Sequence, residues 1–278
     1  SAAASCWTSS RNTSPTSSET VRRSILRADP AGNITLFVLD PVPRADRVVA
    51  AVRLMALMEA EQVGFRCPPL FGGAGRVEMA GGEFCGNAAR AFGMLLAREL
   101  GGLSQVQVEI SGCSHPVTVE VDETQGAARA EMPLPRSVRP ASADGCSGTL
   151  VDLTGIAHFV VEGVPPSLDF FRNAESLFSQ LSGLEAYGVI FLDPSSGTMT
   201  PLVKVPSAGT LVWEGSCGSG SLAAAIAQSQ HIADGAFAQS YLQPSGVIQA
   251  AVTRRNGAAV SAWIGGPVTL DPPITVEL

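Results

Sequence analysis

The chain has 278 residues and a formal net charge of −7, with 45% hydrophobic and 15% charged residues. This length suits two parts that each bury a core, and the acidic balance argues against a nucleic-acid-binding surface. The apolar runs are shorter than the ~18 residues that a membrane span needs, so we expect a globular protein with no membrane partner.

The first half begins with a polar segment and then alternates between strand and helix patterns. Residues 1–20 are rich in Ser and Thr and predict a flexible tail. Residues 34–39 have an extended pattern, and residues 46–61 have helical apolar spacing. Cys85 then precedes residues 88–100, a predicted helix that is apolar on most faces and therefore buried. Predicted strands follow at residues 105–110 and 117–121.

The second half repeats this order around Cys217. A predicted apolar helix follows that cysteine at residues 221–232. We therefore expect an α+β fold in which each half wraps a curved set of strands around one central helix. We place the first lobe at residues 21–128 together with the last strand region, residues 266–278, and the second lobe at residues 129–265. The predicted strands of the second half are residues 150–153, 157–161, 189–192, 202–205, 247–253, 258–264 and 274–278.

The two cysteines open their helices with small residues, Gly86-Asn87 after Cys85 and Gly218-Ser219 after Cys217. A helix N-terminus has unpaired N–H groups and a partial positive charge, so we expect these residues to bind a carboxylate and to lower the thiol pKa. Two such ends that face each other place one sulfur on each side of a carbon. One thiolate then removes a proton, and the other thiol returns one to the opposite face. This arrangement predicts inversion at a carbon, with Cys85 and Cys217 as catalytic residues.

Other residue counts narrow the chemistry. Six cysteines are too few for a disulfide scaffold in a chain of this length, and thiolate chemistry needs reduced thiols, so we expect a cytoplasmic enzyme. Lys204, the single lysine, lies in a predicted strand and makes a pyridoxal phosphate anchor improbable; we expect no cofactor. Metal-binding pairs of the Cys-x-x-Cys type are missing, which argues against a metal-binding or redox protein, and we expect no metal.

Several short stretches in a fixed order resemble one known group of enzymes. Together they resemble the cofactor-independent racemases and epimerases of the diaminopimelate epimerase fold, most closely the histidine racemases of staphylopine-type metallophore biosynthesis. The resemblance implies two pseudo-symmetric lobes with the active site in the cleft between them. It also implies racemisation of L- and D-histidine that supplies D-histidine for an opine-type metallophore. The stretches are residues 30–33, 61–65, 83–88, 111–114, 211–214, 216–220 and 243–244.

The chain departs from diaminopimelate epimerases in the region that holds the substrate's distal end. Ala208 and Gly209 occupy the places of a Glu-Arg pair in that family. Without the arginine, a second substrate carboxylate loses its charge-assisted partner, which argues against diaminopimelate. The family's Gly-Asn-Pro-His element is also altered, to residues 155–158 with His158 retained.

Further residues are candidates for binding the amino acid. Asn33 and Gln62 suit its polar groups, and Glu61 suits an imidazole N–H donor. Glu214 suits the ammonium group, and His158 occupies a position that the family fills with histidine.

Other functions stay open on the sequence alone. One is a racemase or epimerase of another amino acid, including diaminopimelate-like substrates, and another is an isomerase of the phenazine-biosynthesis type, whose relatives lack the thiol pair. The expected partner is a small molecule, an amino acid such as histidine. The oligomeric state stays open, with a homodimer as the candidate.

Overall fold

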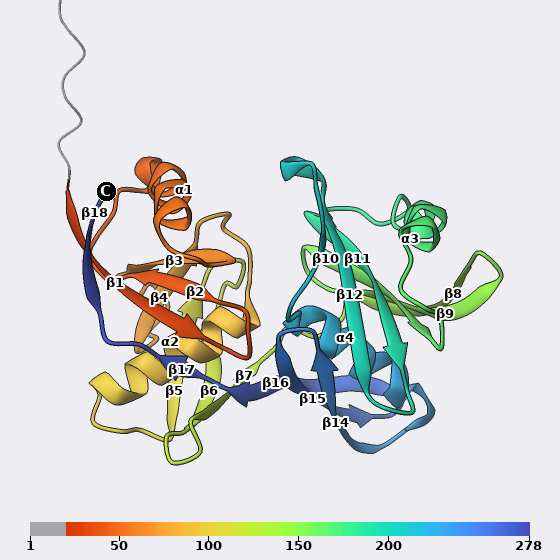
Figure 1. Cartoon of the computed structure of the whole chain (residues 1–278). Coiled ribbons are helices and arrows are strands. Elements are labelled where there is room, and N and C mark those ends of the chain that lie inside the picture. Colours follow the sequence, from red (N-terminus) through yellow and green to blue (C-terminus); the bar gives the residue numbers. More distant parts are fainter. Residues whose placement is uncertain (1–20) are drawn as a thin grey trace, which may run out of the picture.

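The computed structural model describes residues 21–278, so the expected tail at residues 1–20 lies outside the described part. That part is a sheet-rich α+β structure with few helices (Figure 1). The helices are α1 (Arg47–Leu57), α2 (Gly86–Glu99), α3 (Leu168–Ala174) and α4 (Gly218–Gln228), with short 3₁₀ helices at Arg44–Asp46, Glu175–Leu177, Pro206–Ala208 and Ser229–His231. The strands are β1 (Arg22–Asp29), β2 (Thr35–Val38), β3 (Gln62–Cys67), β4 (Gly75–Met79), β5 (Gln105–Ile110), β6 (Val117–Asp122), β7 (Ala127–Glu131), β8 (Ser137–Ala143), β9 (Cys146–Asp152), β10 (Ile156–Glu162), β11 (Ala186–Asp193), β12 (Thr198–Val205), β13 (Thr210–Trp213), β14 (Gly235–Gln243), β15 (Gly246–Arg255), β16 (Ala258–Pro267), β17 (Thr269–Leu270) and β18 (Ile274–Glu277).

The strands of the described part join into one hydrogen-bonded sheet. Neighbouring strands pair from β1 through β7 in chain order, with parallel pairs at β2–β3 and β4–β5. β7 also pairs with β16, which connects the first half of the chain to the second. β18 returns to pair antiparallel with β1, so the end of the chain lies beside its first described strand (Figure 1).

α2 is the buried centre of the first half. Every residue from Gly86 to Ala97 on this helix is buried, and the helix packs against β5, β6 and β7. Gly93 allows α2 to approach β6 closely, because a Cβ atom added at that position would lie only 2.5 Å from a methyl carbon of Val119. The surrounding core is formed by Phe37, Val77, Met94, Val108, Ile110 and their neighbours.

α4 has the same role in the second half, where it packs against β15, β10 and β16. The segment Leu222–Ile226 is completely buried, and three of its five residues are alanines, which let the strands approach the helix closely. Figure 1 shows α2 and α4 in opposite halves of the molecule, each surrounded by strands. None of the helices within residues 21–278 has the length and apolar character of a membrane-spanning helix.

The helix predicted at residues 46–61 is shorter in the structure. α1 ends at Leu57, and Gln62 begins β3, which pairs in parallel with β2. The apolar residues Val63 and Phe65 therefore face a core built with β1 and α1. This change of element brings Glu61 and Gln62 to the start of a strand, where their side chains reach the neighbouring segment around Asn33.

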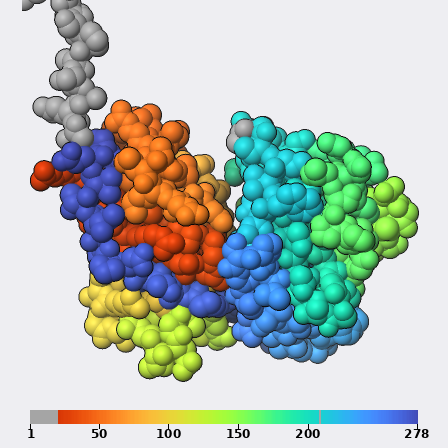
Figure 2. Space-filling model, viewed as in Figure 1, coloured from red at the N-terminus to blue at the C-terminus, as the bar shows by residue number. Residues whose placement is uncertain are grey.

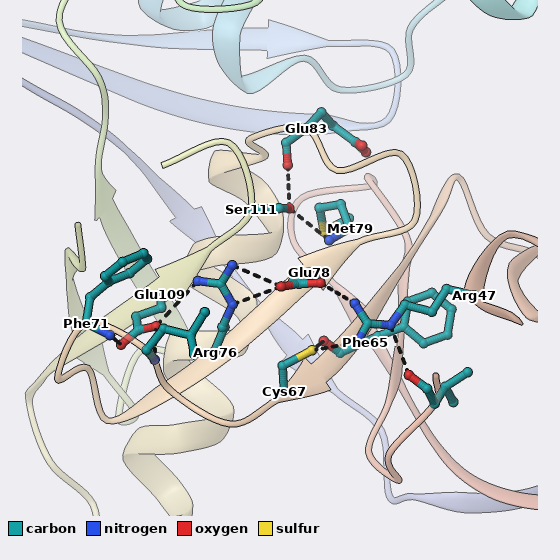
Figure 3. A network of polar contacts seen from close by, with 12 residues as sticks. Arg47, Phe65, Cys67, Phe71, Arg76, Glu78, Met79, Glu83, Glu109 and Ser111 are labelled. Atoms are coloured by element: carbon teal, nitrogen blue, oxygen red, sulfur yellow. Dashed lines mark hydrogen bonds and ion pairs between the residues drawn. The ribbon is translucent and has the colours of Figure 1, made fainter. Parts of the chain in front are cut away.

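A network of charged side chains links α1 to β4 and β5 (Figure 3). Arg76 lies between Glu78 and Glu109, at 2.9 and 3.4 Å, and Arg47 reaches Glu78 from the start of α1. Glu109 is 1% exposed and accepts backbone N–H groups of the loop before β4, including Leu70 at 2.7 Å. The network fixes this loop to the sheet.

Candidate active site

Cys85 is the N-cap of α2 and has an extended backbone, as N-cap residues usually do. Its sulfur accepts the backbone N–H of Ala88 at 3.4 Å, in the way that a serine hydroxyl caps a helix. The side-chain amide of Gln62 lies 3.2 Å from the same sulfur. The thiol therefore faces both a helix N-terminus and a side-chain donor.

The Gln62 amide belongs to a small cluster of polar groups. Its nitrogen lies 2.8 Å from both Asn33 Oδ1 and Thr35 Oγ1, and the amide of Asn33 donates to Glu61. The pairing of β2 with β3 places Thr35 opposite Gln62. The structure thus brings the sequence-predicted residues Asn33, Glu61 and Gln62 together beside Cys85, and adds Thr35.

The loop before Cys85 is held from beneath by Ser111 (Figure 3). The hydroxyl of Ser111 donates to the carbonyl of Glu83 at 2.7 Å and accepts the backbone N–H of Met79 at 2.9 Å. The adjacent Gly112 has φ +76°, and a Cβ there lies 2.6 Å from the backbone nitrogen of Phe84. This contact excludes a larger residue and explains why a Ser-Gly pair follows β5.

Cys217 is the N-cap of α4 in the same way. Its sulfur accepts the backbone N–H of Gly220 at 3.3 Å and lies 3.5 Å from the hydroxyl oxygen of Ser219. The backbone N–H of Cys217 donates to Gln243 Oε1 at 2.7 Å, and the Gln243 amide donates to Ser221. Gln243 therefore fixes the start of the helix, a role that the sequence analysis did not assign.

The two helix starts are in contact. A Cβ atom added to Gly218 would lie 3.5 Å from Asn87 Oδ1, and one added to Gly86 would lie 2.5 Å from the sulfur of Met132. The glycines at both helix starts therefore permit a close approach of the two helices that larger residues would block. The two N-cap cysteines flank this contact, and charge on Cys85 raises the pKa of Cys217.

Arg90 orients Asn87 from inside α2. Its side chain is completely buried; Nε donates to Asn87 Oδ1 at 3.1 Å, and Nη1 donates to the carbonyls of Gly266 and Pro267. Burial lowers the pKa of Arg90 to about 10, and charges on Cys85 and Asp29 oppose that shift. A fixed guanidinium behind the first helix start adds positive charge to the site.

The expected lowering of the thiol pKa values is wrong for this substrate-free structure. Burial and the charge of Glu214 raise the pKa of Cys217 to about 12, although hydrogen bonds from Ser219 and Gly220 lower it. Burial also raises the pKa of Cys85, despite hydrogen bonds from Ala88 and Gln62. Removal of water from a thiolate outweighs the helix N-termini here.

Two carboxylates face the same region. Burial and the charge of Glu61 together raise the pKa of Glu214 to about 7. The pKa of Glu61 is also raised, mainly by burial. A Cβ atom added to Gly215 would lie 3.4 Å from Glu61 Oε1, so the segment that carries Glu214 packs against Glu61. A cation placed between these carboxylates relieves their repulsion.

His158 lies on β10 and is completely buried. Its Nε2 is 2.9 Å from the hydroxyl oxygen of Ser219, and burial lowers its pKa to about 3, so the imidazole is neutral. Ser216, next to Cys217, is 1% exposed, and its hydroxyl has no hydrogen-bond partner among the described residues. Sequence reasoning gave Ser216 no role, because a serine before a Cys-Gly pair has no distinctive pattern.

The thiols of the described cysteines, Cys67, Cys85, Cys113, Cys146 and Cys217, are all free. Across residues 21–278 there is also no cluster of three or more His, Cys, Asp or Glu residues with the geometry of a metal site.

Comparison with known families identifies the group to which this pair of thiols belongs. A family model described as the histidine racemase CntK N-terminal domain matches residues 24–271. The chain belongs to this histidine racemase family. The match includes both Cys-Gly helix starts, and it confirms the resemblance found in the sequence.

Members of the histidine racemase family with curated names are similar over most of their length. A histidine racemase of Fusobacterium nucleatum is 33% identical over 213 residues, which cover 71% of this chain and 77% of that protein. A histidine racemase of Staphylococcus aureus is 26% identical over 253 residues, which cover 87% of this chain and 92% of that protein.

Solved structures of racemase and epimerase type share the fold of this histidine racemase family member. A predicted epimerase from Pseudomonas aeruginosa has a TM-score of 0.65 at 14% identity, with 92% of this chain and 99% of that chain covered. A hydroxyproline epimerase from Agrobacterium vitis has a TM-score of 0.60 at 13% identity, with coverage of 92% and 93%. These likenesses confirm the α+β fold of the epimerase type.

Proposed function

We propose that this protein is a cofactor-independent racemase that interconverts L- and D-histidine through Cys85 and Cys217. The observation that carries the proposal is the contact between two helix starts, each capped by a cysteine sulfur. The curated names of the relatives from Fusobacterium nucleatum and Staphylococcus aureus support histidine as the substrate.

We further propose that the molecule has two lobes, residues 21–128 with residues 266–278 and residues 129–265, and that the substrate enters the cleft between them. Separate apolar cores around α2 and α4 support this division. The notch between the two halves in the space-filling view of Figure 2 also supports it. Closure of the lobes expels water and strengthens every polar contact in the site.

The proposed reaction moves one proton at a time and needs no other reactant. The thiolate of one cysteine takes the α-proton of histidine and becomes a thiol, which leaves the electron pair on Cα. The thiol of the other cysteine then gives its proton to the opposite face and becomes a thiolate. The reverse direction exchanges the two roles, so each enantiomer has its own base.

The difficult step is the formation of negative charge beside a carboxylate. We assign its stabilisation to backbone N–H groups of Gly86, Asn87, Gly218 and Ser219, which begin α2 and α4. Such donors are fixed before the reaction and aim at the carboxylate as it becomes enolate-like.

Recognition of the amino acid is assigned to the polar groups around both sulfurs. Asn33 and Gln62 suit its polar groups beside Cys85, Glu61 suits the imidazole, and Glu214 suits the ammonium group. The raised pKa values of both carboxylates support a site that is completed by a cation. We assign His158, a predicted substrate-binding residue, to the second thiol instead, because its Nε2 lies 2.9 Å from the Ser219 hydroxyl oxygen.

The decisive experiment is incubation of the protein with L-histidine in heavy water, followed by chiral chromatography and mass spectrometry. We expect D-histidine that carries deuterium at Cα, without any added cofactor. A parallel panel with proline, hydroxyproline and diaminopimelate tests the substrate. Turnover of one of these without turnover of histidine contradicts the substrate assignment but leaves the two-thiol mechanism intact.

We also propose that D-histidine from this reaction serves an opine-type metallophore, and that the working form is a homodimer. Size-exclusion chromatography with light scattering tests the dimer separately from the activity.

A further inference from the structure

The two sulfurs differ in the kind of side chain that faces them. Cys85 faces the amide nitrogen of Gln62, which only donates hydrogen bonds. Cys217 faces the hydroxyl of Ser219, which either donates or accepts. Ser219 stabilises a thiolate at Cys217 only if its hydroxyl proton points at the sulfur. Another group must therefore set the direction of this hydroxyl.

His158 is in the position to do so. Its Nε2 lies 2.9 Å from the Ser219 oxygen, and His158 is completely buried. Its Nδ1 has no hydrogen-bond partner among the described residues. β10 pairs in parallel with β11, and this pairing places Gly188 opposite His158. A Cβ atom added to Gly188 would lie 3.3 Å from Nδ1. Nδ1 thus lies beside a glycine, without a hydrogen bond to any acceptor among the described residues.

This surrounding selects one tautomer of the neutral ring. A proton on Nδ1 buries an N–H donor without an acceptor, whereas a proton on Nε2 has the Ser219 oxygen as its acceptor. With Nε2 protonated, the ring donates to Ser219 Oγ, and the hydroxyl proton of Ser219 is free to point to the sulfur 3.5 Å away. His158 then donates to Ser219, and Ser219 donates to the sulfur of Cys217.

We propose that His158 holds the Ser219 hydroxyl as a hydrogen-bond donor to the sulfur of Cys217, so that His158 and Ser219 are positioning residues for the second thiol. The pair is the counterpart of Gln62 at Cys85, and it replaces the direct substrate contact expected for His158. Its catalytic consequence rests on the proposed function, whereas its effect on the thiol does not.

The electrostatic surroundings give this hydrogen bond its importance. The titratable groups that face Cys217 are Glu214 and Cys85, and both oppose its ionisation. Burial of the thiol also opposes its ionisation, whereas the N–H of Gly220 and the hydroxyl of Ser219 favour the thiolate. Ser219 is therefore one of two donors that offset an unfavourable environment. A buried, neutral imidazole keeps this donor fixed over the whole pH range in which thiols ionise.

The test measures thiol reactivity in the substrate-free full chain. Iodoacetamide alkylates thiolates, so at one pH below the thiol pKa the rate reports the thiolate fraction; peptide mass spectrometry separates Cys85 from Cys217. We expect Ser219→Ala to slow alkylation of Cys217 about 10-fold or more, the effect of losing one hydrogen bond to a charged group, with little change at Cys85. His158→Ala is expected to act in the same direction.

Two further variants decide whether the effect runs through the hydroxyl. His158→Gln retains an amide donor near Nε2 and is expected to preserve the Cys217 rate, which distinguishes hydrogen bonding from packing. Ser229→Ala is the matched control, because that buried hydroxyl at the far end of the same helix donates to the Ile226 carbonyl at 3.1 Å and lies outside the contacts of Cys217. We expect it to leave the Cys217 rate unchanged.

An unchanged Cys217 rate in Ser219→Ala overturns the proposal, and so does a further fall when His158→Ala is added to Ser219→Ala. If His158→Ala does not fold, His158→Gln and Ser219→Ala carry the decision. Racemisation measured in the same samples separates this proposal from the function: the alkylation pattern without any turnover refutes the racemase and leaves the positioning role standing.

Discussion

The side-chain amide of Gln62 lies 3.2 Å from the sulfur of Cys85 and approaches it from the start of β3. An amide nitrogen only donates, so this contact favours the thiolate over the thiol. The same nitrogen faces Asn33 Oδ1 and Thr35 Oγ1 at 2.8 Å, so its two protons are shared among three acceptors, and the two oxygens hold the amide in place.

The first prediction concerns this amide. Gln62→Glu keeps the shape of the side chain but replaces the donor by an acceptor and a negative charge, and we expect kcat for racemisation to fall about 10- to 100-fold. Chiral chromatography of the product measures it, and thermal unfolding followed by circular dichroism controls for loss of structure. A Gln62→Glu protein with unchanged kcat contradicts the role of the amide.

The second prediction separates the two thiols. Cys85→Ser and Cys217→Ser each remove one acid–base group, and we expect racemisation to fall about 10²- to 10⁴-fold in either variant. The remaining thiol still serves one face, so each variant is expected to exchange the α-proton of only one enantiomer in heavy water, without inversion. The two variants should prefer opposite enantiomers.

Cys113→Ser is the control for this pair, because that sulfur lies near His115 in a turn and caps no helix. We expect it to retain full activity. Exchange of both enantiomers by Cys85→Ser or Cys217→Ser shows that some other group is the base, and excludes the two-thiol mechanism.

The sequence predicted the parts of this site that depend on local pattern. A cysteine followed by small residues and an apolar helix was sufficient to place Cys85 and Cys217 at helix starts. The structure brings Glu61 and Gln62 beside Asn33 and Cys85, although the segment that begins at Gln62 is a strand and not the end of a helix. Strand pairing decided that point, because Gln62 continues the sheet beside β2.

The parts that sequence did not predict depend on contacts between distant segments. The support of Cys217 by Ser219 and His158 requires α4 to pack on β10, and no local pattern encodes that packing. The direction of the thiol pKa values was also missed. Helix N-termini are visible in a sequence, whereas the burial that outweighs them is a property of the folded chain.

The third prediction concerns stability rather than catalysis. The carboxylate of Glu109 accepts the N–H groups of Leu70 and Phe71, both at 2.7 Å, and pairs with Arg76 (Figure 3). Glu109→Ala leaves these buried donors without their acceptor, and we expect the free energy of unfolding to fall by about 3 kcal/mol. Urea denaturation measures the change, and kcat at a temperature where the variant is folded should stay within about twofold of the original value.

Glu99→Ala is the matched control for Glu109→Ala. Glu99 forms a two-pronged pair with Arg66, at 2.7 and 2.8 Å, but both side chains are partly exposed. Exposed pairs contribute about 1 kcal/mol or less. Equal losses in the two variants contradict the structural role of the Glu109 network.

The fourth prediction uses the raised pKa of Glu214, which burial and the charge of Glu61 bring from 4.5 to about 7. Between these two pH values the folded protein holds a proton that the unfolded chain has lost, so stability contributed by this group falls as pH rises and is lost above about 7. Glu214→Gln does not ionise. We therefore expect it to match the original protein at pH 4.5 and to be more stable at pH 8.

The size of this gain and its control follow from the same shift. A rise from 4.5 to about 7 corresponds to at most about 3.5 kcal/mol, because each pKa unit equals about 1.4 kcal/mol, and partial access of water reduces the effect. Urea denaturation at both pH values measures it without substrate, and the exposed Glu59→Gln is the control that should show no such difference. Histidine should reverse the order at pH 8, because its ammonium group pairs with the Glu214 carboxylate and stabilises only the unsubstituted protein. A Glu214→Gln protein that is protected by histidine as strongly as the original places the ammonium group elsewhere in the site.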